Sequence, residues 1–269
     1  VNLTKDTQKL EKVLVVGYGT QKKVNMTGAV AMIDSKVLEN RPVQNVSTAL
    51  QGTMPGVQVT SGGGRPGQDG GTIRVRGVGT LNTADPYILV DGIETGTMNS
   101  VDPNDIESIS VLKDAASAAI YGSKASNGVV LITTKRGKTG KARISYNGYV
   151  GFQRPTEMID RISSYDYARL YSQSMIDESL TPRFNETDIE NFKNGTSPNT
   201  DWYDEAYRTG VQHSHNVSVS GGTENAKYMG SVGYLGQDGN IDNFTYRRYN
   251  LRTNIETQLA KNFQLSLGV

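Results

Sequence analysis

Hydrophobic and polar residues alternate with a period of two in the C-terminal half of the chain. In the run that follows residue 143, one face carries Ile144, Tyr146, Val150 and Phe152. The opposite face of the same run carries Ser145, Asn147 and Gln153. Successive side chains of a β-strand point to opposite faces, so this alternation predicts a strand with one apolar face and one polar face.

The same alternation returns three times toward the C-terminus. Its apolar positions are Tyr228, Val232 and Tyr234, then Tyr249, Leu251 and Ile255, then Phe263, Leu265, Leu267 and Val269. Each run is about 9–11 residues long, which is the length that a tilted strand needs to cross a bilayer. A soluble sandwich has the same period with its apolar face turned inward. The pattern alone therefore leaves two interpretations open, transmembrane strands or a soluble β-rich binding module.

The segment before these runs mixes short strands with short helices. Apolar runs predict strands over residues 30–33, 57–60, 72–76, 87–90, 106–112 and 129–134. Helices are predicted over 45–50 and over 115–121, where Asp114 stands at the N-cap and Gly122 just after the end. Asp102 before Pro103 predicts the cap of a single helical turn. A long polar excursion over about 154–208 contains one further predicted helix, over 165–178.

Composition excludes several function classes. The chain of 269 residues has a formal net charge of +1, which gives no field to attract nucleic acid. Cysteine is absent, so disulfides and thiolate metal sites are excluded. The only histidines, His213 and His215, have no evident third ligand nearby, and we expect no metal.

The sequence also gives no sign of a cofactor or of catalysis. The glycine-rich run over 61–67 lacks the Gly-Lys-Ser/Thr ending of a phosphate-binding loop. The acidic residues between 91 and 114 have no histidine base near them in the sequence, and capping explains Asp102 and Asp114. We therefore expect neither a cofactor nor enzyme activity.

Several motifs in a fixed order give the sequence a family resemblance. They are 10–23 (LEKVLVVGYGTQKK), 26–30 (MTGAV), 50–57, 73–77 (IRVRG), 87–92 (YILVDG), 104–115, 121–123, 127–128, 201–202, 221–222 and 248–252 (RYNLR). With them the chain resembles, over nearly its whole length, the TonB-dependent outer-membrane transporters of the SusC/RagA type found in Bacteroidetes. The resemblance implies an α+β plug domain followed by antiparallel strands of an incomplete transmembrane β-barrel.

The resemblance also implies a domain order. Residues 1–23 would hold the end of an N-terminal extension and the TonB box, 24–141 the plug, and 142–269 the first barrel strands with the excursion at about 154–208. About five strands are visible in the sequence, whereas a closed plugged barrel needs about 22. The remaining strands are expected from the same, longer protein.

Two groups of residues receive roles from the resemblance. The first is a coupling segment that an energy-transducing partner binds as an added edge strand. It comprises Glu11, Lys12, Val13, Leu14, Val15, Val16, Gly17 and Tyr18. The second is the pair Arg74 and Arg76, expected on one side of a strand and facing carboxylates of the barrel wall, which arginine binds in a bidentate manner.

The implied function is active import of a nutrient, a glycan or a peptide, across the outer membrane of a Gram-negative cell. The expected partners are the C-terminal domain of TonB and a SusD-like surface lipoprotein. The soluble β-rich binding module stays the alternative, and we expect no nucleic-acid partner.

Overall fold

The computed structural model describes residues 13–16, 19–22, 30–39, 41, 43–77, 79, 83–260 and 263–269. The chain divides into two compact units. The first comprises residues 1–151, 212–237 and 245–269, and the second comprises residues 152–211 and 238–244. The predicted boundaries at residues 23 and 141 are not the boundaries of these units, and they stay a prediction. No helix among the described residues is both long and apolar enough to span a membrane.

The N-terminal part of the first unit is an α+β domain, which we call the mixed-sheet domain (residues 30–134). Its five-stranded sheet has the order β3 (Val30–Asp34), β8 (Ile106–Leu112), β9 (Val129–Thr134), β6 (Tyr87–Val90) and β7 (Ile93–Glu94). Strands β6 and β9 are parallel, and the other pairs are antiparallel. A separate hairpin joins β4 (Val57–Ser61) to β5 (Gly71–Val75). All six strands predicted in this part of the sequence are confirmed.

Short helices complete the mixed-sheet domain. They are α1 (Ser35–Glu39), α2 (Val46–Ala49), η2 (Met98–Ser100), η3 (Pro103–Asp105), α3 (Ala115–Ala118) and η4 (Ala119–Ala125). Asp102 caps η3 as predicted, because its carboxylate accepts a hydrogen bond from Asn104 N at 2.9 Å. Asp114 stands at the N-cap of α3 as predicted, although its side chain makes no capping hydrogen bond.

The core of this domain lies around its two central strands. Six of the seven residues of β8 and five of the six residues of β9 are buried. Ile109 and Val130 belong to a large apolar cluster, and Leu112 and Val129 to a smaller one. A strand covered on both faces buries consecutive side chains, which explains the continuous apolar run 129–132 of β9. In β8 the buried positions also include Ser108 and Ser110.

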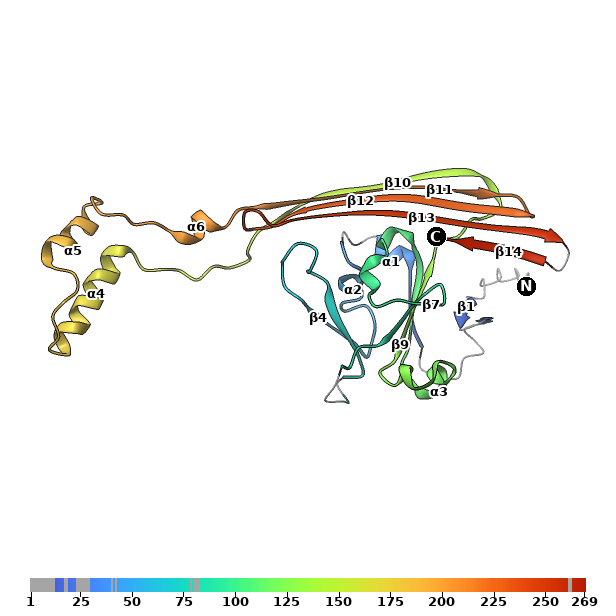
Figure 1. Ribbon diagram of the computed structural model, residues 1–269, viewed down its shortest axis with the longest axis horizontal. Coiled ribbons are helices and arrows are strands. Elements are labelled where there is room, and N and C mark those ends of the chain that lie inside the picture. Colours follow the sequence, from blue (N-terminus) through green and yellow to red (C-terminus); the bar gives the residue numbers. More distant parts are fainter. Residues whose placement is uncertain are drawn as a thin grey trace, which may run out of the picture. The chain divides into compact units, whose positions relative to one another are not determined.

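Five antiparallel strands follow and form the long-stranded sheet. In spatial order they are β10 (Gly140–Gln153), β11 (Gly210–Gly222), β12 (Ala226–Asp238), β13 (Thr245–Ala260) and β14 (Phe263–Gly268). Figure 1 shows these long strands running side by side. Strands β10, β12 and β13 are longer than the predicted runs, since polar residues at their ends, such as Lys141 and Arg247, also belong to the strands.

The second unit contains three helices: α4 (Ser164–Asp177), α5 (Glu186–Lys193) and α6 (Trp202–Ala206). Helix α4 confirms the helix predicted over 165–178. Helix α5 begins with a capping box, in which Asn185 and Asp188 exchange side-chain and backbone hydrogen bonds. Aromatic rings pack α4 against α5, with Phe184 between Tyr167 and Phe192.

Candidate functional site

One face of β13 bonds to the mixed-sheet domain through polar side chains at alternate positions. Arg248 donates to the carbonyl oxygens of Asn99 at 2.9 Å and of Gln44 at 3.2 Å. Two residues further along, Asn250 Nδ2 donates to the carbonyl oxygen of Ser100 at 3.0 Å. The acceptors are backbone atoms of η2 and of the segment before α2, so these bonds fix the position of both segments against the strand.

The next position on this face carries an ion pair. Arg252 Nη2 donates to Asp91 Oδ2, and Asp91 follows β6 in a turn with a positive φ of 49°. Asp91 also accepts hydrogen bonds from Thr134 N at 3.0 Å and from Thr134 Oγ1 at 2.6 Å. The carboxylate is thus held from within its own domain, and it presents its charge to the strand.

Two further contacts of β13 continue this series at the segment that connects β9 of the domain to β10 of the sheet. Asn254 Nδ2 donates to the carbonyl oxygen of Lys135 at 3.2 Å. Arg136 pairs with Glu256 at 2.7 Å. Every second residue from Arg248 to Glu256 therefore contacts the polypeptide that precedes β10, as a period of two requires.

A second group of contacts places buried carboxylates of the domain against β11 and β12. Asn216 Nδ2 donates to Asp102 Oδ2 at 3.2 Å and lies 3.5 Å from Asp105 Oδ1. Asn216, Asp102 and Asp105 are 3%, 5% and 2% exposed. Burial, and next the negative charge of Asp102, raises the pKa of Asp105 above its ordinary value of 3.8. The approach is close, because a Cβ added at Gly233 of β12 would lie 2.6 Å from Asp102 Oδ2.

A third contact lies at the end of β12. The Gln237 side chain is 2% exposed. Its amide donates to Asp69 Oδ2 at 3.0 Å, and its carbonyl oxygen accepts from Gly67 N at 3.1 Å. Asn45 Nδ2 holds the other carboxylate oxygen of Asp69 at 2.8 Å. The loop that follows β4 is thereby tied both to its own domain and to the sheet.

The opposite face of the long-stranded sheet is apolar and exposed. Its large side chains are Ile144, Tyr146, Val150 and Phe152 on β10, Val217 and Val219 on β11, Tyr228 and Val232 on β12, and Tyr249, Leu251 and Ile255 on β13. Tyr249 and Leu251 are 75% and 72% exposed, whereas Arg252 between the sheet and the domain is largely buried. The arrangement is the inverse of a soluble sandwich, since the polar face is covered and the apolar face is open.

The predicted arginine pair lies elsewhere in the mixed-sheet domain. Strand β5 ends at Val75, and Arg76 has a positive φ of 61°, so the two arginines do not continue one strand face. Arg74 pairs with Asp85, and Arg76 pairs with Asp114, both within the domain. Pairing of these arginines with carboxylates of a barrel wall stays a prediction.

The predicted coupling segment is described only in part. Val13–Val16 form β1, which pairs in antiparallel register with β2 (Gly19–Lys22). The short extended strand expected here is confirmed, while its role in coupling stays a prediction. Glu11, Lys12, Gly17 and Tyr18 lie outside the described residues.

The histidine pair is located on β11. The ring centroids of His213 and His215 lie 5.4 Å apart, and His215 Nδ1 is 2.8 Å from the hydroxyl of Tyr146. Within the described residues, no group of three or more His, Cys, Asp or Glu side chains is arranged to hold a metal ion.

Comparison with known proteins assigns the class of this fold. Residues 22–129 match the TonB-dependent receptor plug domain. The chain is 40% identical, over 95% of its length, to the TonB-dependent receptor SusC of Bacteroides thetaiotaomicron. It is 36% identical, over its whole length, to the TonB-dependent receptor P3 of Formosa agariphila. It spans 25% of the length of each of these relatives.

Solved structures agree with this assignment. The RagAB peptide importer in its open-open state superposes with a TM-score of 0.82 and 27% sequence identity, covering 96% of this chain and 31% of that one. The chain is therefore similar, over nearly its whole length, to the SusC/RagA-type TonB-dependent receptors, with a plug domain followed by antiparallel strands of an incomplete barrel. We now call the mixed-sheet domain the plug and the long-stranded sheet the wall.

Proposed function

We propose that this chain is the plug and first wall segment of an outer-membrane transporter that imports a nutrient, a glycan or a peptide, by TonB-dependent movement of the plug. The observation that carries the proposal is the division of β13 into two faces. Arg248, Arg252 and Glu256 hold the plug, while Tyr249 and Leu251 are exposed on the other side. That division fits a strand between lipid and a plugged polar lumen.

The chemistry of the plug–wall interface supports a plug that moves. The contacts described above are hydrogen bonds and ion pairs, and their polar groups can be satisfied by water once the plug shifts. The net contribution of such bonds is about 0.5–1.5 kcal/mol each, since each replaces a bond to water. An interface of this kind positions the plug accurately and still lets an external force displace it.

Coupling is assigned to residues 11–18. Strand β1 pairs with β2 along one edge. In the proposed mechanism the C-terminal domain of TonB adds a strand to the other edge and pulls on the plug. A SusD-like lipoprotein binds the substrate outside the cell, and the substrate enters the periplasm when TonB displaces the plug. The remaining wall strands belong to the same receptor, because open sheet edges are not tolerated in lipid.

Uptake assays on cells that produce the receptor test this mechanism. Deletion of residues 11–18 is expected to abolish uptake of a fluorescent oligosaccharide mixture and of a fluorescent peptide mixture, while surface binding in energy-depleted cells persists. Val15→Pro should act like the deletion, because proline removes a backbone donor from the strand, and Val15→Ala is the matched control. Normal uptake by the deletion variant would exclude TonB-driven movement through this segment.

A further inference from the structure

The two segments of the second unit, residues 152–211 and 238–244, connect long strands at one and the same end of the antiparallel sheet. At the other end, residues 223–225 join β11 to β12 and residues 261–262 join β13 to β14. The long excursion and the β12–β13 connection leave from the opposite end. Outer-membrane barrels have short periplasmic turns and longer extracellular loops. On the proposed function, the second unit is therefore extracellular.

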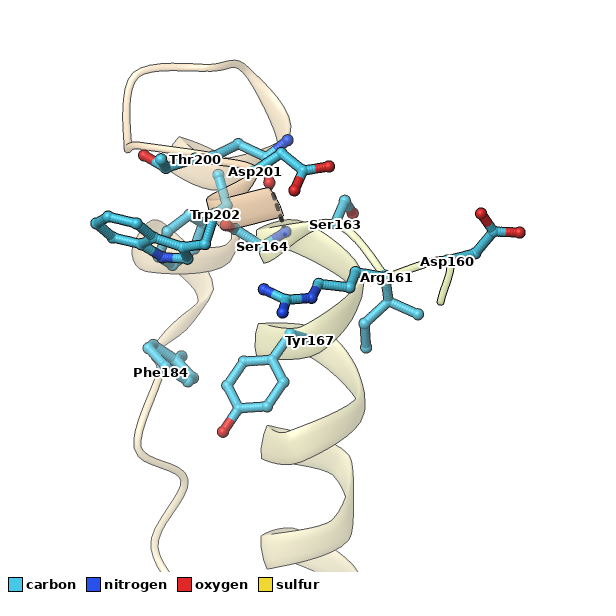
Figure 2. A pocket seen from close by; sticks show the side chains of 12 residues that line it. Asp160, Arg161, Ser163, Ser164, Tyr167, Phe184, Thr200, Asp201 and Trp202 are labelled. Carbon is cyan, nitrogen blue, oxygen red and sulfur yellow. Dashed lines mark hydrogen bonds between the residues drawn. The ribbon is translucent and has the colours of Figure 1, made fainter. Parts of the chain in front are cut away.

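This unit contains a cleft of about 920 Å³. Its apolar lining includes Tyr167 of α4, Trp202 of α6, and Phe184 and Phe192. Trp202 is 66% exposed and Tyr167 is 49% exposed, so both rings present surface to solvent. Figure 2 shows Trp202, Phe184 and Tyr167 bordering the space toward which the Arg161 guanidinium points. The volume lies in the range of small-ligand sites, about 300–1,000 Å³.

Arg161 supplies hydrogen-bond donors to this cleft. Its guanidinium carbon lies 3.6 Å from the centroid of the Tyr203 ring, so the group is held by a cation–π contact. Within the described part of the chain, the guanidinium makes no ion pair or hydrogen bond to a protein acceptor. Its N–H donors point in fixed directions and are available to a ligand.

The polar frame of the cleft is ordered by its own bonds. Asn199 Oδ1 accepts from Ser164 N at 2.8 Å, which ties the loop before α6 to the start of α4. Asp201 Oδ1 accepts from Tyr203 N at 2.8 Å and caps α6. Tyr167 and Trp202 are thus carried on helices that these hydrogen bonds cap and connect, and this lowers the entropy cost of binding.

We infer that this cleft binds an oligosaccharide at the extracellular face. Sugar rings have apolar C–H faces that can stack on exposed Trp and Tyr rings, and hydroxyl groups that accept from Arg161 and donate to Asp201. The lining residues come from helices and loops, so the cleft offers no strand edge for an extended peptide. The inference rests on the proposed function for its location and names the substrate class.

The single tryptophan of the sequence makes the cleft observable. The receptor is purified in detergent and titrated with maltohexaose, cellohexaose, hexagalacturonate and an unstructured hexapeptide. The emission of Trp202 is isolated as the difference between the receptor and its Trp202→Phe variant. At least one oligosaccharide is expected to change this emission to saturation, and the hexapeptide is expected to leave it unchanged.

Calorimetric titration of variants assigns the binding to the cleft. Trp202→Ala and Arg161→Gln are each expected to weaken oligosaccharide binding about tenfold or more, as removal of a central contact does. Leu170→Ala, on an exposed position of α4 that does not line the cleft, should bind like the unchanged receptor. Because Trp202 and Arg161 are exposed, both variants should keep the α4–α5 packing, which circular dichroism checks.

Three results would overturn the inference: no emission change with any oligosaccharide, a change with the hexapeptide alone, or oligosaccharide binding that survives both substitutions. These titrations require neither TonB nor energy. If Val15→Pro leaves uptake intact while the titration succeeds, the transport mechanism fails and the sugar site stands. If the titration fails while Val15→Pro abolishes uptake, only the sugar site is lost.

Discussion

Arg252 of the wall and Asp91 of the plug form an ion pair in which both side chains are largely buried, with exposures of 19% and 18%. The two residues are 161 positions apart in the sequence. Thr134 holds the carboxylate from the plug side, and Arg252 Nε is buried without a hydrogen-bond partner. The pair is therefore the most enclosed ionic contact between plug and wall among the described residues.

A double-mutant cycle measures what this pair contributes. Asp91→Asn keeps a residue that tolerates the positive φ and removes the charge, and Arg252→Gln removes the partner. We expect a coupling of about 1–3 kcal/mol in the free energy of plug opening, because both charges are mostly out of water. Hydrogen exchange of the β8 and β9 amides gives that free energy. Additive effects of the two substitutions would show that the pair does not couple plug to wall.

Two glycines of β12 give a matched steric test of the interface. Gly233→Ala would bring a Cβ within 2.6 Å of Asp102 Oδ2, whose carboxylate is held by Asn216 and Asn104. The plug must then shift, and we expect faster protease cleavage within the plug and destabilisation of about 1–3 kcal/mol. At Gly230 the nearest heavy atoms would be 3.9 Å away, so Gly230→Ala should behave like the unchanged receptor. Equal effects of the two substitutions would contradict the close approach seen here.

The buried Asp105 makes plug stability depend on pH. Its pKa is raised in the folded state, chiefly by burial, so the folded state holds the proton at pH values where the unfolded state has lost it. The contribution of Asp105 to stability is thus greatest at low pH, and it is lost as the pH rises from about the ordinary value of 3.8 through the raised value. The nearby Arg252 opposes this shift, and Asp102 adds to it.

Urea unfolding of the plug at several pH values tests this dependence. Asp105→Asn should remove the loss of stability with rising pH that comes from this carboxyl group. The same substitution should stabilise the plug at neutral pH. Asp204→Asn, an exposed position on α6, is the control and should leave the profile unchanged. A profile that is the same with and without the Asp105 carboxyl would refute the assignment.

The sequence predicts those strands and helices that are defined by their local pattern of apolar and polar residues. The apolar run of β9 and the alternation in β13 can be predicted because the burial of side chains follows the period of the strand. The alternation also predicts the polar positions of β13. Their partners could not be read, since Arg252 meets Asp91 only through the tertiary fold. The sequence does not identify Asn216 and Gln237 as contact residues, because its pattern does not distinguish a buried amide side chain from any other polar residue of a strand.

Two errors have local causes. The strand predicted to reach Arg76 stops one residue earlier, because Arg76 takes a left-handed backbone conformation before Gly77. Helix α5 was missed, although Asn185 followed three residues later by Asp188 is a readable capping box.

The central claim, that the exposed apolar face of the wall meets lipid, can be measured with spin labels on cysteines introduced into these 269 residues, which contain none of their own. The receptor is reconstituted in lipid vesicles with a label at Tyr249→Cys, Leu251→Cys or Ser145→Cys. Labels at 249 and 251 should collide readily with oxygen and poorly with a water-soluble nickel chelate, and the label at 145, on the polar face, should do the reverse. Free access of the nickel chelate to positions 249 and 251 would contradict the account.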